Sequence, residues 1–313
     1  MKPTRRALLA SLVPASAATM ALGSASAARP PAEPFKYCLN TATIRGQKLT
    51  PEQEIEIAGK AGYNAIEPWI EKLEAYAKTG KPWTELIKRL AEYNLSVESA
   101  IGFPAWIVND ATLRKKGLED ARRAMNLVAQ LGGKRLASPP VGATDPQATI
   151  DLRQAADRYR DLLEIGDQIG VVPQVEIWGF SKTLSRLGEG ALVAIETGHP
   201  RACVLADIYH LYKGGSGFDT LKLLSAAGMQ VFHVNDYPKI PRDKIADKDR
   251  VYPGDGIAPL KPTLKCLYDL GFQGVLSLEL FNPEYYKQDA LEVAKLGLQK
   301  MKKVAHEAVG LIL

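Results

Sequence analysis

Short apolar runs alternate with amphipathic segments along the chain from residue 35 onward. The apolar runs are rich in branched and aromatic residues, which is typical of strands buried on both faces of a parallel sheet. The predicted strands span residues 35–39, 65–69, 96–101, 135–138, 171–178, 203–210, 231–236 and 274–281. The segments between and after them have helical periodicity over residues 51–62, 83–93, 118–131, 151–170, 185–197, 219–227, 260–270 and 289–305.

Several helix ends carry recognisable local signals. Thr50 can cap the first helix, Pro51 suits its first position, and Gln53 completes a capping box. Gly62 follows as a helix terminator. Eight strand–helix units, with strand starts roughly 30–40 residues apart, predict a parallel (β/α)8 TIM barrel. The turn after the first strand lacks the Gly-x-Gly-x-x-Gly of a dinucleotide-binding fold, so we expect one α/β barrel domain over residues 35–313.

The first 28 residues differ from the rest of the chain. Lys2, Arg5 and Arg6 precede an acid-free apolar run that ends in small residues, the pattern of a cleavable signal peptide. The adjacent arginines favour a twin-arginine signal, and a general secretion signal is the alternative. We therefore expect an exported protein, periplasmic or extracellular after cleavage, with residues 29–34 as a proline-rich tether.

Composition narrows the class of protein further. The formal net charge is +5, and loss of the three positive residues in the signal leaves +2, so the mature surface offers no strong attraction for nucleic acid. No other segment is apolar for long enough to span a membrane. The three cysteines are too few for a disulfide framework, and we expect buried free thiols.

The candidate chemistry lies at the carboxyl ends of the last four predicted strands, where TIM barrels place their sites. Glu176, Asp207, His233 and Glu279 occupy these positions, one on each strand. Three carboxylates and one imidazole suit one divalent ion such as Mn²⁺, Mg²⁺, Co²⁺ or Zn²⁺. The alternative is that Asp207 is a cap and His233 a buried structural histidine.

The chain as a whole resembles the xylose-isomerase-like TIM-barrel superfamily of sugar isomerases and epimerases. The resemblance rests on motifs that cover nearly all of the mature chain: Val175-Glu176-Ile177, Asp207-x-x-His210, His233-Val234-Asn235-Asp236, Arg250-Val251-Tyr252-Pro253-Gly254-Asp255-Gly256 and Leu276-Ser277-Leu278-Glu279.

The resemblance implies roles for these residues. It implies that Glu176, Asp207, His233 and Glu279 hold one divalent metal and that the two glutamates are the acid–base pair. His210 is expected to contact a substrate oxygen. The arginine that often follows the strand-seven motif in this superfamily is not matched, and Lys239 or Arg250 is a candidate replacement.

The residue types themselves support the same reaction. Moving a carbonyl or a stereocentre along a sugar starts with removal of a proton next to the carbonyl. A bound metal can act there as a Lewis acid, while one carboxylate takes the proton and another returns one.

Other substrate-binding candidates follow strand ends. Glu67 and Glu98 end the second and third strands, where each either binds substrate hydroxyls or is solvated. Trp69, Trp106 and Trp178 are expected either to stack on a sugar ring or to pack in the core, and for Trp178 the pocket is favoured.

These observations favour a metal-dependent isomerase or epimerase of an unphosphorylated sugar or keto-sugar. A dehydratase acting on a keto-polyol is an alternative that the same site allows. A nuclease with several zinc ions is disfavoured because only His210 and His233 lie near the site. An exported sugar-binding barrel without activity is the non-enzymatic alternative, and a homo-oligomer is compatible with either.

Overall fold

The computed structural model describes residues 33–145, 147 and 149–311. The expected signal segment and residues 29–32 of the tether lie outside the described residues. The strands are β1 (Lys36–Asn40), β2 (Ala65–Glu67), β3 (Ser96–Val97), β4 (Ala100–Ile101), β5 (Arg135–Ser138), β6 (Val172–Glu176), β7 (Val204–Asp207), β8 (Val231–Val234) and β9 (Val275–Leu278).

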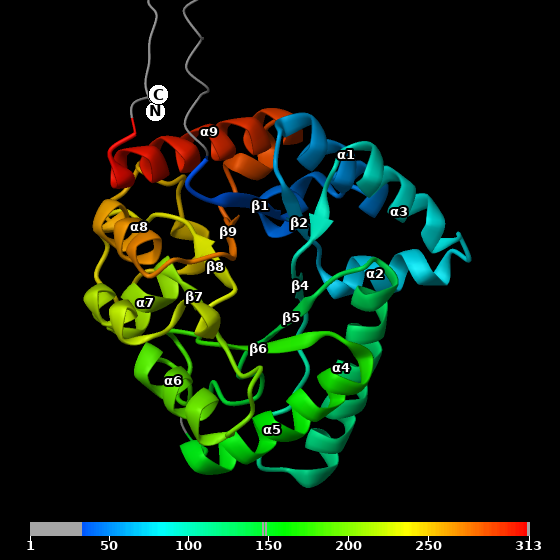
Figure 1. Ribbon diagram of the computed structural model, residues 1–313, viewed down its shortest axis with the longest axis vertical. Coiled ribbons are helices and arrows are strands. Elements are labelled where there is room, and N and C mark those ends of the chain that lie inside the picture. Colours follow the sequence, from blue (N-terminus) through cyan, green and yellow to red (C-terminus); the bar gives the residue numbers. More distant parts are fainter. Residues whose placement is uncertain (1–32, 146, 148, 312–313) are drawn as a thin grey trace, which may run out of the picture. The chain divides into compact units, whose positions relative to one another are not determined.

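Helices separate the strands and surround them (Figure 1). The α-helices are α1 (Pro51–Ala61), α2 (Ile70–Lys78), α3 (Trp83–Glu92), α4 (Ala111–Gln130), α5 (Leu152–Ile169), α6 (Leu187–Glu196), α7 (Ile208–Gly214), α8 (Leu260–Asp269) and α9 (Ala290–Val309). Short 3₁₀ helices are η1 (Thr41–Gln47), η2 (Phe218–Leu223), η3 (Ala226–Gly228), η4 (Asp247–Asp249) and η5 (Tyr285–Lys287).

The nine strands form one parallel sheet in the order β3-β2-β1-β9-β8-β7-β6-β5-β4. β3 pairs with β2 and β4 pairs with β5, and both belong to the third predicted strand. The two ends of the sheet therefore meet on one segment, and a parallel bridge between Trp69 and Ile101 adds to the closure. The predicted single-domain (β/α)8 barrel is confirmed, with its third strand interrupted at Glu98 and Ser99.

Local signals fix several helix ends as the sequence predicts, but α4 begins at Ala111 instead of residue 118, and residues 208–210, predicted as strand, begin α7. At α1 the Thr50 side chain accepts a hydrogen bond from the Gln53 backbone N–H, and the Gln53 side-chain oxygen accepts one from the Thr50 backbone N–H. Gly62 ends the helix with φ of 93°, a conformation that favours glycine. The segment predicted as a helix over residues 219–227 instead forms η2 and η3, and α2 was not predicted because Trp69 gives it no side-chain cap.

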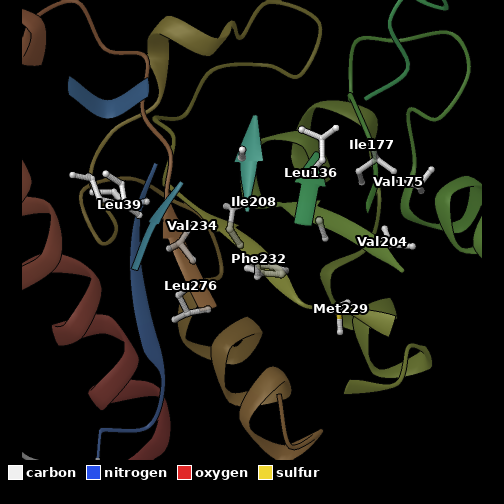
Figure 2. Close-up of a cluster of buried hydrophobic side chains, with 14 of the residues drawn as sticks. Leu39, Leu136, Val175, Ile177, Val204, Ile208, Met229, Phe232, Val234 and Leu276 are labelled. Atoms are coloured by element: carbon white, nitrogen blue, oxygen red, sulfur yellow. The ribbon is translucent and has the colours of Figure 1, made fainter. Parts of the chain in front are cut away.

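Buried side chains form two layers because alternate strand residues point to opposite faces. Small and medium residues such as Cys38, Ala65 and Val231 form one cluster. Their strand neighbours Leu39 and Phe232 belong to the larger cluster shared with the helices, which Figure 2 shows in part. Because Phe232 points toward the helices, the next residue, His233, points to the opposite face of the sheet, toward the inside of the barrel.

Several sequence-level expectations concern individual residues and segments. Cys38 and Cys203 are buried free thiols, whereas Cys266 is only partly buried. Within the described residues, no helix combines the length and apolar character that crossing a membrane requires. The oligomeric state stays a prediction.

One buried carboxyl outside the barrel mouth gives a pH-dependent prediction. Glu54 on α1 is 1% exposed and 3.3 Å from Lys72. Burial raises the pKa of Glu54 to about 7, although Lys72 acts to lower it. The folded protein therefore holds this proton at pH values where the unfolded chain has released it, so stability is lost as pH rises from about 4.5 to 7.

We expect the free energy of unfolding of Glu54→Gln at pH 8 to exceed that of the wild type by about 1–3 kcal/mol. At pH 4 the two proteins should differ little. Guanidinium unfolding at both values measures this. Glu92→Gln is the matched control, because Glu92 is exposed on the neighbouring helix α3. An unchanged difference between variant and wild type across this pH range would contradict the assignment.

Candidate metal and substrate site

Three of the four metal-ligand candidates come together at the carboxyl end of the barrel. Asp207 is the last residue of β7, His233 lies in β8, and Glu279 directly follows β9. One atom from each lies within 4.8 Å of the others. His233 Nδ1 is 3.2 Å from Glu279 Oε2 and 3.8 Å from Asp207 Oδ2.

The second ring nitrogen of His233, Nε2, contacts a buried carboxylate. His233 Nε2 lies 3.0 Å from Glu67 Oε2, which also accepts hydrogen bonds from Asn40 Nδ2 at 3.0 Å and Ser277 Oγ at 2.7 Å. Donation from Nε2 to Glu67 leaves His233 Nδ1 as the free acceptor, and Nδ1 has no hydrogen-bond partner. Metal-ligating histidines commonly bind a carboxylate through the second nitrogen.

This donor set fits a divalent cation. Asp207 and His233 are completely buried and Glu279 is 4% exposed. Carboxylate oxygens and imidazole suit Mg²⁺, Mn²⁺, Co²⁺ or Zn²⁺. The unpartnered Nδ1 faces both carboxylates, where a shared cation would satisfy all three groups. Glu176 lies outside this group of three, and its part in metal binding stays a prediction.

Arg250 is the buried cation nearest to the two acidic ligands. Its Nη1 donates to Asp207 Oδ2 at 3.0 Å and Glu279 Oε2 at 2.8 Å, and its Nη2 donates to Asp247 Oδ1 at 2.5 Å. Its guanidinium carbon also lies 4.9 Å from the centre of the Phe281 ring. Arg250 thereby offsets part of the negative charge of the site and fixes the orientation of the two carboxylates.

The two candidate acid–base residues have opposite electrostatic environments. Burial raises the pKa of Glu176, and Glu279 and Asp207 act in the same direction against His233. Burial also acts to raise the pKa of Glu279, but His233 and Arg250 outweigh it and hold this pKa below its ordinary value. The pKa values of the two carboxyl groups are thus displaced in opposite directions, as in acid–base pairs.

His210 has a defined orientation at the edge of the pocket. Its Nδ1 accepts a hydrogen bond from the Gly179 backbone at 3.2 Å. Burial lowers its pKa well below the ordinary value, and Arg250 acts in the same direction. Its Nε2 lies 3.2 Å from Arg250 Nη2, which can only donate. A neutral imidazole accepts at one nitrogen, so only one of these two contacts is a hydrogen bond in either tautomer.

Comparison with known protein families shows what this barrel is related to. The xylose isomerase-like TIM barrel model matches residues 55–304. The chain belongs to the xylose isomerase-like TIM barrel family. The resemblance to this family that the sequence motifs predict is therefore confirmed.

The relatives of this chain include inosose isomerases. The inosose isomerase of Bacillus velezensis is 26% identical over 86% of this chain and 97% of its own length. That of Bacillus subtilis is 26% identical over 83% of this chain and 95% of its own.

Solved structures show the same fold. The IolI protein with a bound zinc atom has a TM-score of 0.80 at 23% identity, covering 88% of this chain and 99% of its own. An L-ribulose 3-epimerase has a TM-score of 0.72 at 17% identity, covering 88% and 96%.

Some of the remaining substrate-binding candidates line the pocket of this xylose isomerase-like barrel, and others do not. Its volume is about 130 Å³. It is lined by Trp69, Ile101, Phe103, Glu176, Trp178, Phe180, His210, Asp247, Arg250, Glu279 and Phe281. The structure thus brings Trp178, His210 and Arg250 to the two glutamates. Trp106 is instead buried, and its ring N–H donates to the carbonyls of Ser138 and Pro139.

Two other expected substrate-binding residues do not line the pocket, and their contacts with substrate stay predictions. Glu67 is completely buried beneath His233, and its Oε2 is held by Asn40, His233 and Ser277. Lys239 is exposed and does not line the pocket. Glu98 forms ion pairs with Lys134 and Arg135. The sequence did not single out Asn40, although it ends β1 at the register position of Glu67.

Asp236 anchors the loop that brings Arg250 back to the site. Its carboxylate accepts hydrogen bonds from the backbones of Tyr237, Gly254, Gly256 and Ala258. The Asp236 backbone pairs with Val251, so the loop begins and ends at adjacent positions. A Cβ atom on Gly256 would lie 2.3 Å from Asp236 Oδ1, which explains the glycine. The Pro253–Gly256 turn is thus held in place by Asp236.

Proposed function

We propose that the chain is a divalent-metal-dependent isomerase or epimerase of an unphosphorylated sugar or keto-sugar. The isomerase relatives and epimerase neighbours support the enzyme class, a sugar isomerase or epimerase, as the sequence predicts. The observation that carries the metal dependence is the buried group of Asp207, His233 and Glu279 with the unpartnered His233 Nδ1. The zinc of the IolI protein supports a metal in this fold.

The reaction follows from the position of the two glutamates. Glu279, whose carboxylate pairs with Arg250, takes a proton from the carbon next to the substrate carbonyl. Glu176 comes from β6, with β7 and β8 between it and β9, and holds the proton that is returned. A bound cation supplies Lewis-acid polarisation of the carbonyl. His210 orients a substrate oxygen, and Arg250 keeps Glu279 in place.

The charges of the pocket support an unphosphorylated substrate. Arg250 is the one lysine or arginine among the residues that line the pocket. It already contacts Asp207, Asp247 and Glu279. A phosphate would therefore meet several acids and no uncommitted Lys or Arg side chain.

The test combines metal content with isotope exchange. We expect one divalent ion per chain by elemental analysis and, in D₂O, deuterium on the carbon next to the carbonyl of the converted keto-sugar. The product should otherwise keep the mass of the substrate, whereas a dehydratase product would be lighter by one water. Conversion without deuterium entry at early times would contradict proton abstraction and favour a hydride shift.

The Glu67–His233 contact gives a further prediction on metal affinity. Glu67→Ala removes the acceptor that fixes His233 Nε2, so we expect divalent-metal affinity to fall by about 10–100-fold, the effect typical of outer groups at metal sites. Glu67→Gln should lose less, because its amide oxygen can still accept from His233. Titration calorimetry of metal-stripped protein measures both.

Glu98→Gln serves as the control, since Glu98 ends the neighbouring strand region but binds Lys134 and Arg135 away from the pocket. Equal metal affinity in wild type and Glu67→Ala would show that His233 does not depend on this carboxylate.

A further inference from the structure

One side of the pocket is built almost entirely from aromatic rings. We call Trp69, Phe103, Trp178, Phe180 and Phe281 the aromatic wall. The ring centres follow one another at 6.1 Å from Phe281 to Trp69, 5.2 Å to Phe103, 6.1 Å to Trp178 and 5.2 Å to Phe180. The rings therefore form one continuous arc beside the two glutamates.

The other residues that line the pocket differ from the aromatic wall because most of them are polar. Glu176, His210, Asp247, Arg250 and Glu279 are the polar residues that line the cavity. The aromatic wall and Ile101 offer no hydroxyl, amide or charged side chain. The Trp69 ring N–H is already used, because it donates to Asn40 Oδ1 at 3.1 Å. The guanidinium groups of Arg45 and Arg250 already lie over the Trp69 and Phe281 rings, 4.3 Å and 4.9 Å from the ring centres, so the stacking surface of the wall is that of Phe103, Trp178 and Phe180.

Two rings of the wall remain unusually exposed. Phe103 is 46% exposed and Phe180 is 40% exposed, one on either side of Trp178. Exposed aromatic surface that is continuous with a polar pocket is characteristic of ligand-binding grooves. A ligand that extends beyond the glutamates would cover these two rings.

We infer that the aromatic wall is a second subsite that receives a planar apolar substituent, such as an aryl ring, carried by the substrate. This inference rests on the proposed function, since the polar end of the same molecule lies at Glu176 and Glu279. A free sugar can stack on Trp178 alone, and its hydroxyls gain no hydrogen bond from the neighbouring Phe103 and Phe180 rings. An aryl ring instead stacks on Trp178 and its neighbours.

The test compares two probes on the metal-loaded full chain. We expect p-nitrophenyl β-D-glucopyranoside to bind at least about ten-fold more tightly than methyl β-D-glucopyranoside, as measured by titration calorimetry. In the Phe103→Ala/Phe180→Ala double variant most of this difference should disappear, with metal content unchanged and methyl glucoside affinity within about two-fold of wild type. Tyr268→Ala is the control, because Tyr268 is an equally exposed aromatic residue on α8, outside the pocket.

Equal affinity for both probes, or an aryl preference that survives the double variant, would overturn the inference. If the double variant instead converts a dimer to a monomer in light scattering without changing the ratio of affinities, the wall is an interface between copies and the inference is wrong. These outcomes do not affect the proposed function, provided that the wild type still binds the metal and still incorporates deuterium. Loss of metal binding and exchange in the wild type would overturn the proposed function itself.

Discussion

Asp207→Asn is expected to lose divalent-metal binding and, with it, measurable turnover. The substitution keeps the shape of the side chain and its Oδ1, which accepts the His210 backbone N–H at 2.8 Å and begins α7. It removes the negative charge of Oδ2, which faces His233 Nδ1 and Arg250. We expect metal affinity to fall by at least about 100-fold, beyond the effect of outer groups.

Calorimetry and elemental analysis after metal loading measure this loss, and thermal unfolding checks that the barrel remains folded. Asp247→Asn is the matched control. Asp247 lines the same pocket and contacts Arg250 but lies outside the group of three ligands, so its variant should keep the metal. Full metal occupancy in Asp207→Asn would remove Asp207 from the metal site.

Glu176→Gln is expected to reduce turnover by about 10²–10⁴-fold, the usual effect of losing a general acid or base. Because Glu176 lies outside the group formed by Asp207, His233 and Glu279, we expect the variant to retain most of its metal. Glu279→Gln should lose both metal and activity. Turnover and metal content measured on the same preparations separate the two roles.

Substrate binding provides the second measurement for Glu176. The affinity of Glu176→Gln for substrate should change far less than its turnover, since the pocket keeps its shape. Unchanged turnover would exclude Glu176 from proton transfer. Loss of the metal together with activity would instead favour the four-ligand site that the sequence predicts.

The barrel was predictable because each unit carries its own local signals. Buried apolar strands, the Thr50–Gln53 capping box and glycine helix ends act over a few residues and need no knowledge of the fold. The prediction failed where local signals are weak: η2 and η3 replace a helix in a short segment that ends at Gly228.

The site was only partly predictable because depth in a barrel depends on register between strands. Glu67 and Glu176 both end strands, yet Glu67 is completely buried under His233 whereas Glu176 lines the pocket. Lys239 follows strand β8 more closely than Arg250, but the loop returns to Asp236 and delivers Arg250 to the site. Processing of residues 1–28 and export stay predictions.

The Asp236 anchor has a consequence for how such barrels diversify. Residues 239 and 241–244 are exposed, while Asp236 at one end and Ile245 at the other are buried. Insertions or deletions between these two buried residues leave Arg250 in place, because the backbone N–H groups that hold the turn before α8 all donate to the Asp236 carboxylate. This short exposed segment can therefore change in length or sequence while the pocket keeps its lining.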